Sequence, residues 1–247
     1  MPARFGVFCE LPCAESVEII GHAGWDFVIV DCEHGAISSS MLPGMLRAAE
    51  SVKLLAIVRV ASNDPAQIQL ALDAGAAGVQ IPQIASVAAA RAAISSAKFY
   101  PIGMRGLNPF VRAAKFSAEP VAEFLSRSNR ETTVVLQLES RDGFEAAAEI
   151  CAMDGLGGIF IGPYDLSQSF GIPGQVSDDL VLNAGAEIIR AANEHNVPVS
   201  VYAGTPHAAR QWVAMGAQAI CYSVDTVLMM SAMRDTLRIV RLNPDVL

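Results

Sequence analysis

Short apolar runs recur along the chain, and eight of them are rich in valine, isoleucine and leucine. These runs cover residues 5–9, 26–31, 54–60, 78–82, 133–139, 158–162, 197–202 and 219–223. Near-continuous apolar runs are typical of strands that are covered on both faces, and alanine-rich stretches of helical period separate most of them. The pattern therefore predicts strands that alternate with helices.

Four of the predicted strands follow a glycine-bearing turn, because AGWD, AGAAG, MDGLGG and MGAQ lie directly before the second, fourth, sixth and eighth apolar runs. Glycine just past a helix end supplies the left-handed residue that stops the helix. Eight strand–helix units with short connections predict one closed (β/α)₈ barrel, a TIM barrel, over residues 1–247. An open doubly wound sheet is the alternative, but no GxGxxG motif follows the first strand to support a dinucleotide-binding fold.

One connection is much longer than the others and joins the fourth strand to the fifth. It contains a predicted helix over 86–97, the loop FYPIGMRGLNP and a second helix near 119–128. Long loops after barrel strands commonly serve as lids or subunit contacts, so Arg105 in this loop is a candidate for the rim of an active site.

Composition narrows the classes of function. The net charge is −8 and the basic residues form no run, which argues against nucleic acid as a partner. We expect no membrane partner, because no apolar run reaches the roughly 18 residues that span a bilayer. The N-terminal sequence MPARFGVFCE does not resemble a signal peptide, so we expect a cytoplasmic protein. Five cysteines without a CxxC pair indicate reduced thiols that fill the core.

Polar residues gather where the predicted strands end. Barrel enzymes place their active sites at the carboxyl ends of the strands, so a set of ionisable side chains there indicates a catalytic cleft. Taken singly, each has a structural explanation: Asp31 can cap a turn, Arg59 can pair with a carboxylate, and Asp165 can cap a helix. The residues that follow or end the predicted strands are Asp31, Glu33, His34, Arg59, Gln137, Glu139, Gly162, Pro163, Tyr164, Asp165 and Tyr202.

Glu139 and Asp165 follow neighbouring strands, so both carboxylates can face one point. Two carboxylates with open coordination positions suit a hard divalent cation such as Mg²⁺ or Mn²⁺. A glycosidase with two carboxylates is the competing hypothesis, although aromatic residues are only 6% of the chain and sugar sites need aromatic platforms. His34 follows a strand beside Glu33, which favours acid–base work over a structural role.

Five segments together resemble the HpcH/HpaI aldolases, metal-dependent class II pyruvate aldolases with a barrel of the phosphoenolpyruvate/pyruvate type. The resemblance covers about residues 5–230, and the order of its motifs makes it specific. The motifs are VDCEHG, VRV followed by NDPAQIQLALDAGAAGV, YPIGMRG, QLES and IFIGPYDLSQSFG.

The resemblance implies a role for each matching residue. Glu139 and Asp165 would bind the metal, which would be Mg²⁺, Mn²⁺ or Co²⁺, with Gln137 beside them, and Arg59 would face the keto oxygen of pyruvate. His34, paired with Asp73, would transfer protons. Backbone N–H groups of Tyr164 and Asp165, in the segment that begins with Gly162 and Pro163, would hold the pyruvate carboxylate, as helix N-termini hold anions. Asp31 and Glu33 would support these groups.

The implied activity is a lyase that reversibly joins a 2-oxo acid, pyruvate or oxaloacetate, to an aldehyde through a pyruvate enolate. The alternatives are oxaloacetate decarboxylation, chemistry similar to that of macrophomate synthase, and a barrel that binds without catalysis. A Schiff-base route is disfavoured because none of the three lysines ends a predicted strand.

Two features bear on specificity and assembly. Tyr164 and Tyr202 stand where the family has smaller residues, so they either fill space or reshape the pocket for the aldehyde. The last helix, TVLMMSAMRDTLRIVRL, is rich in methionine and leucine. By resemblance, this helix would pack against or exchange with another subunit of a homo-oligomer, a hexamer or trimer of dimers.

Overall fold

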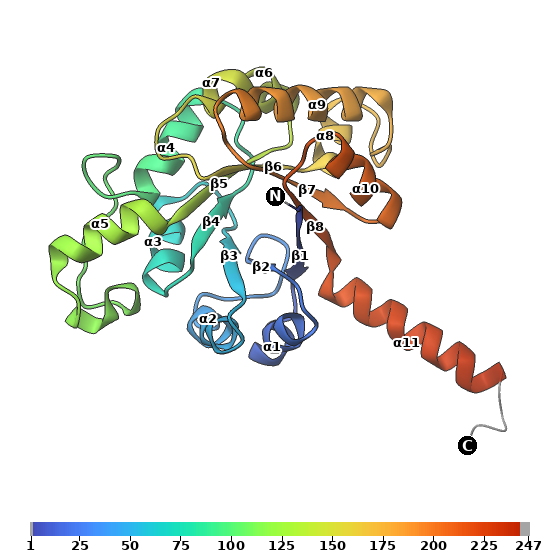
Figure 1. Cartoon of the computed structure of the whole chain (residues 1–247), viewed down its shortest axis with the longest axis horizontal. Coiled ribbons are helices and arrows are strands. Elements are labelled where there is room, and N and C mark those ends of the chain that lie inside the picture. The colour runs from blue at the N-terminus through green and yellow to red at the C-terminus, as the bar shows by residue number, and fades with distance from the viewer. Residues whose placement is uncertain (1, 243–247) are drawn as a thin grey trace.

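Eight parallel strands form a closed barrel in the order of the sequence, as Figure 1 shows in the computed structural model, which describes residues 2–242. Every predicted strand is present, with ends that differ from the prediction by no more than two residues. The strands are β1 (Arg4–Cys9), β2 (Phe27–Asp31), β3 (Leu55–Arg59), β4 (Gly78–Ile81), β5 (Thr133–Leu138), β6 (Gly158–Ile161), β7 (Val199–Ala203) and β8 (Ala219–Val224).

Helices follow the strands and cover the outside of the barrel, which confirms the (β/α)₈ prediction (Figure 1). The predicted domain, 1–247, includes residue 1 and residues 243–247, which lie outside the described residues. The helices are α1 (Ala14–His22), α2 (Leu42–Ser51), α3 (Pro65–Asp73), α4 (Val87–Ala97), the 3₁₀ helix η1 (Arg112–Ser117), α5 (Val121–Glu131), α6 (Arg141–Glu145), α7 (Ala147–Cys151), α8 (Pro163–Ser169), α9 (Asp179–Glu194), α10 (Pro206–Ala214) and α11 (Asp225–Leu242).

Two apolar layers hold the barrel together. The larger lies between the sheet and the surrounding helices, and it includes the fully buried side chains of Val28, Ile81 and Leu136. A smaller cluster fills the barrel interior and includes Phe8 and Phe160, whose rings meet edge to face with centroids 5.8 Å apart. Because both faces of each strand are buried, the strands read as continuous apolar runs in the sequence.

The glycine turns behave as the sequence predicts. Gly75, after α3, has φ +98°, and Gly216, after α10, has φ +105°. An L side chain is strained at such angles, so glycine lets the chain leave each helix and enter the next strand.

Helix α11 differs from the other helices because it extends away from the barrel (Figure 1). Its apolar side chains are largely exposed, including 61% of Met233 and 48% of Leu237. Within residues 2–242, no helix is both long enough and apolar enough to cross a membrane.

Candidate active site

Arg59, the last residue of β3, is held rigidly at the carboxyl end of the barrel. Its Nε and Nη2 atoms donate to Asp31 Oδ1 and Oδ2 at 2.8 and 2.6 Å, and its guanidinium carbon lies 4.4 Å from the centre of the Phe8 ring. Asp31 is fully buried at the end of β2, so this bidentate pair is shielded from water. The third guanidinium nitrogen of Arg59, Nη1, lies 3.2 Å from Glu33 Oε2.

Asp31 also caps the turn that follows β2. Its Oδ1 atom accepts hydrogen bonds from the backbone N–H groups of Glu33 at 3.0 Å and His34 at 3.4 Å. Both structural explanations, the turn cap and the ion pair with Arg59, are therefore correct. They do not compete with a functional explanation, because the same contacts fix the position of His34 and Arg59.

The carboxylate of Glu139, which directly follows β5, is oriented by donors on both of its oxygens. The backbone N–H of Gln83 donates to Oε1 at 2.7 Å, and the side-chain amide of Gln137 donates to Oε2. Gln137 is itself held by Gln80, whose Nε2 donates to Gln137 Oε1 at 2.5 Å. A row of amides from β4 and β5 thus supports the carboxylate of Glu139.

Gly162 leaves the space that Glu139 occupies. A Cβ atom added at Gly162 would lie 2.9 Å from Glu139 Oε2 and 3.0 Å from Glu139 Cβ, which is too close. Gly162 is also the N-cap of α8, with Asp165 in the first turn, so the expectation that Asp165 caps this helix is wrong. Asp165 instead presents an exposed carboxylate beside Glu139.

The electrostatics at Glu139 favour a bound cation. Burial raises the pKa of Glu139 to about 7, with further increases from the charges of Asp165 and Glu33, against the opposing hydrogen bonds from Gln137 and Gln83. A divalent cation would relieve this repulsion, and carboxylate oxygens suit Mg²⁺ or Mn²⁺. Within residues 2–242 no three His, Cys, Asp or Glu side chains group around one metal position. Water and substrate oxygens would therefore complete the coordination.

Two cavities meet at the mouth of the barrel and share His34 and Asp165. One, of about 570 Å³, is also lined by Glu33, Gln83 and Glu139. The other, of about 220 Å³, reaches into the barrel past Arg59 and Gln137 to Phe160. The His34 side chain is 66% exposed and lies 4.0 Å from Glu33, so it can reach a ligand in either cavity.

Tyr164 and Tyr202 lie together at the smaller cavity. Their ring centroids are 5.8 Å apart in an edge-to-face arrangement, and Tyr164 is 52% exposed. Burial raises the pKa of Tyr202, with a further contribution from the nearby Tyr164 hydroxyl. Both rings line the cavity, as does Pro163 at the start of α8.

Asp73, predicted to pair with His34, and Arg105, predicted to lie at the rim of the site, are both away from the mouth of the barrel. Asp73 ends α3, which runs back from the carboxyl end of β3, so it lies at the level of the amino ends of the strands. There its Oδ1 atom accepts a 2.6 Å hydrogen bond from Arg105, whose guanidinium stacks on Phe99. Within one chain Asp73 is therefore bonded to Arg105 and not to His34, and Arg105 is not at the rim of this site.

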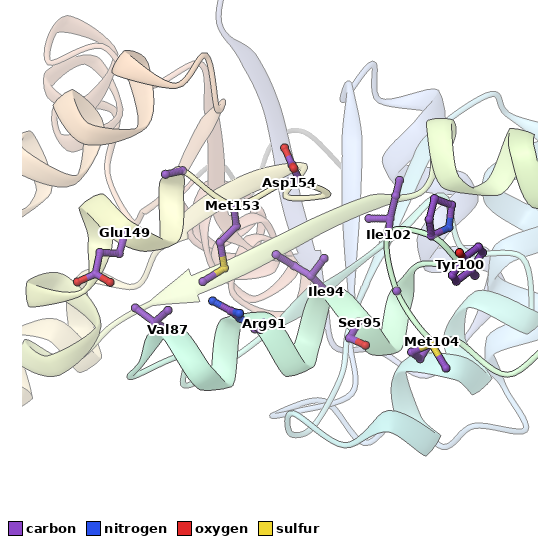
Figure 2. Close-up of a pocket in the computed structure, with 13 residues that line it drawn as sticks. Val87, Arg91, Ile94, Ser95, Tyr100, Ile102, Met104, Glu149, Met153 and Asp154 are labelled. Carbon is purple, nitrogen blue, oxygen red and sulfur yellow. The ribbon is translucent and has the colours of Figure 1, made fainter.

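A further cavity, of about 710 Å³, lies on the outside of the barrel between α4, α7 and the loop that contains Tyr100 and Met104 (Figure 2). None of the predicted site residues lines it. Its size therefore does not mark the active site, since the oriented ionisable groups are at the carboxyl ends of the strands.

The cysteines form no common site in the described chain. All five are free thiols, and Cys9, Cys151 and Cys221 are buried as expected. Cys32 is half-buried and packs against the core, whereas Cys13 is exposed, so the expectation that all five fill the core is wrong for Cys13.

Sequence reasoning missed three residues of the site: Glu10, Gln80 and Gln83. Glu10 and Gln83 follow β1 and β4, so the rule of reading residues at strand ends, applied to every strand, includes them. Gln80 lies within β4, and only its contact with Gln137 shows its role.

The structure is a (β/α)₈ barrel that presents several carboxylates, one arginine and one histidine at the carboxyl ends of its strands. Comparison with known proteins then specifies the group: the model of the HpcH/HpaI aldolase/citrate lyase family matches residues 4–232. The chain belongs to this family, as the sequence resemblance predicts.

Similar proteins agree with the family assignment. The chain is 31% identical to the hydroxypyruvate/pyruvate aldolase of Sagittula stellata, over 93% of this chain and 90% of the relative. It is also 31% identical to the 5-keto-4-deoxy-D-glucarate aldolase of an Enterobacter species, over 93% of this chain and 89% of that protein. The crystal structure of macrophomate synthase superposes with a TM-score of 0.86 at 26% identity, covering 98% of this chain and 85% of that one. This chain is therefore a carbon–carbon lyase.

Proposed function

We propose that this enzyme is a divalent-metal-dependent aldolase that reversibly cleaves a 4-hydroxy-2-oxo acid into pyruvate and an aldehyde. The observation that carries the proposal is the oriented Glu139 carboxylate beside the exposed Asp165 carboxylate, at the mouth that also holds the fixed guanidinium of Arg59. Bound between these carboxylates, Mg²⁺, Mn²⁺ or Co²⁺ would act as a Lewis acid that withdraws charge from the enolate of pyruvate.

Side chains and backbone N–H groups of the chain would bind and orient the substrate. Arg59 places a fixed donor at the keto oxygen, where charge develops in the transition state, because Asp31 holds its guanidinium in one orientation. The first turn of α8 leaves the N–H groups of Tyr164 and Asp165 without intrahelical acceptors, and these would bind the carboxylate of the substrate. Gln137 would line the same position while it holds Glu139.

His34 is the proposed proton carrier. The hydroxyl of the aldol must lose a proton when the carbon–carbon bond breaks, and His34 is the exposed base beside the cavity, so it would accept this proton through a water molecule. Glu33, 4.0 Å away, is the carboxylate of the same chain that approaches the imidazole.

Exchange of the methyl protons of pyruvate with D₂O tests the proposal without any aldehyde. We expect NMR to show exchange with Mg²⁺ or Mn²⁺ that EDTA abolishes, because enolisation requires the metal. The absence of exchange with every divalent metal tested would contradict the proposed function and favour a barrel that only binds.

Oxaloacetate decarboxylation is the second candidate, and the structural similarity to macrophomate synthase favours chemistry from the same enolate. His34→Ala distinguishes the two reactions, since loss of CO₂ leaves no hydroxyl to deprotonate. We expect the variant to lose far more aldol cleavage than decarboxylation. Equal damage to both would remove His34 from the proposed role.

We also propose that α11 packs against another copy of the chain, in a homo-oligomer such as a hexamer. Met230, Met233, Leu237 and Val240 are spaced alternately by three and four residues, so they form one apolar seam on an exposed helix. Met233→Glu with Leu237→Glu should lower the mass measured by analytical ultracentrifugation. An unchanged mass would show that the seam is not the contact.

A further inference from the structure

Glu10 lies where the chain leaves β1, at the outer part of the 220 Å³ cavity. Arg59, Gln137 and Phe160, which line the same cavity, are at most 8% exposed, whereas Glu10 is half-buried and Tyr164 is 52% exposed. The burial of the lining residues therefore falls from the barrel interior toward Glu10. A 2-oxo acid bound at Arg59 would point its variable end toward this outer part.

The backbone of Glu10 is fixed from two sides. Its N–H donates to Asp225 Oδ1 at 3.0 Å, and the neighbouring Leu11 N–H donates to Asp225 Oδ2 at 3.1 Å. On the other side, a Cβ atom added at Gly35 would lie only 3.1 Å from the Glu10 Cα, so the turn after β2 packs directly against this residue. The fold thus holds the start of the Glu10 side chain in place.

The carboxylate of Glu10 has no such support. It accepts no hydrogen bond and forms no ion pair with any residue in the described part of the chain. Burial raises its pKa, as do the charges of Asp31 and Asp225, while Arg59 and His34 act in the opposite direction. Because no side chain of the described residues hydrogen-bonds to this carboxylate, it is available to a ligand in the cavity that it lines.

We propose that Glu10 selects the acceptor aldehyde by charge: the cavity accepts an aldehyde whose far end is neutral and hydroxylated, and it disfavours one that ends in a carboxylate. The inference rests on the proposed aldol reaction. A free carboxylate accepts hydrogen bonds from hydroxyl groups and repels a second carboxylate, and the hydroxyls of Tyr164 and Tyr202 offer further polar contacts.

The experiment uses two aldehydes of nearly equal size. D-glyceraldehyde ends in a hydroxymethyl group, and tartronate semialdehyde ends in a carboxylate at the same position. Each is condensed with pyruvate by the wild-type enzyme, by Glu10→Gln, which removes the charge and keeps the size, and by Glu10→Asp, which keeps the charge. Glu18→Gln, an exposed glutamate of α1, is the control. Pyruvate proton exchange is measured for every variant.

We expect wild type to prefer glyceraldehyde, and Glu10→Gln to raise kcat/KM for tartronate semialdehyde about tenfold, or about 1.4 kcal/mol, relative to glyceraldehyde. Glu10→Asp should keep the wild-type preference, Glu18→Gln should change nothing, and exchange should persist in all variants.

Three results would overturn the inference while exchange persists: an unchanged preference in Glu10→Gln, an equal loss for both aldehydes, or no condensation with either aldehyde. An equal loss would mean that Glu10 acts on the chemistry common to both substrates. If the wild-type enzyme itself shows no exchange of the pyruvate methyl protons, the proposed function is overturned instead, because this exchange involves no aldehyde.

Discussion

The two ends of the barrel both carry charged side chains, but they arrange them differently. At the amino end, Asp73 pairs with Arg105 and Glu50 with Arg112, so each carboxylate has its own cation. At the carboxyl end, Asp31, Glu33, Glu139, Asp165 and Glu10 surround one arginine, Arg59, and one histidine, His34.

The difference distinguishes charges that are balanced within the chain from charges that are not. A carboxylate that is paired with its own cation is compensated within the chain, whereas the carboxyl end has more carboxylates than cations. An excess of carboxylates is unfavourable until a cation arrives, and such perturbed groups in a cleft are typical of functional sites. Changes at the two ends should therefore affect different properties.

The largest effect is expected from Glu139→Gln. Loss of this carboxylate should remove the bound metal and lower kcat about 10³-fold, which corresponds to about 4 kcal/mol of transition-state stabilisation. Calorimetric titration with Mn²⁺ and the pyruvate exchange rate measure the two effects. Glu145→Gln, on exposed α6 of the same strand–helix unit, should change neither. Normal Mn²⁺ binding by Glu139→Gln would contradict the assignment of the metal position.

Arg59→Met and Arg105→Met compare the two ends directly. Arg59→Met should cost about 3–5 kcal/mol in the free energy of unfolding, because it leaves the fully buried Asp31 unpaired, and should lower the exchange rate about 10²- to 10³-fold. Arg105→Met should cost about 1–3 kcal/mol, since the Asp73 side chain is 20% exposed and can be hydrated. Urea unfolding measures stability.

Arg59→Lys provides a second variant if Arg59→Met does not fold, because it keeps the charge but cannot form the bidentate pair. Mn²⁺ affinity should be unchanged in Arg105→Met. A large loss of Mn²⁺ affinity there would mean that the two ends are coupled and that the distinction between them fails.

Gly162→Ala should lower Mn²⁺ affinity about 10- to 100-fold, since the new Cβ displaces the Glu139 carboxylate from its supports. Gly162 has φ −98°, which alanine adopts readily, so the effect comes from crowding of Glu139 and not from backbone strain. Gly44→Ala is the matched control, because its added Cβ meets no atom within 4 Å. Equal Mn²⁺ affinity in the two variants would show that Glu139 does not need this space.

Gln83→Ala should have the smallest effect, less than about fivefold on the exchange rate. The variant loses the exposed 3.2 Å hydrogen bond from the Gln83 side chain to Glu33 but keeps the backbone N–H that holds Glu139. Steady-state exchange measurements are sufficient to detect it. A loss as large as that of Glu139→Gln would mean that the side chain contacts the ligand.

The sequence by itself determined the barrel and much of its candidate site. Strands buried on both faces must be apolar throughout, and residues such as Gly75 and Gly216 must adopt positive φ. The order of the strands and helices, and the residues at which they end, can therefore be predicted from the local sequence. The strand-end rule brought Arg59, Glu139 and Asp165 to one mouth because parallel strands of a closed barrel all end at the same face.

Only the tertiary structure decided which of these charges are paired. Asp73 and Arg105 lie far apart in the sequence, and their hydrogen bond depends on how the long β4–β5 connection folds back onto α3. The position of Glu10 likewise depends on contacts that its backbone makes with Asp225 and Gly35, which come from distant segments. Local pattern records burial and turns, whereas the pairing of charges depends on distances between side chains that folding alone brings together.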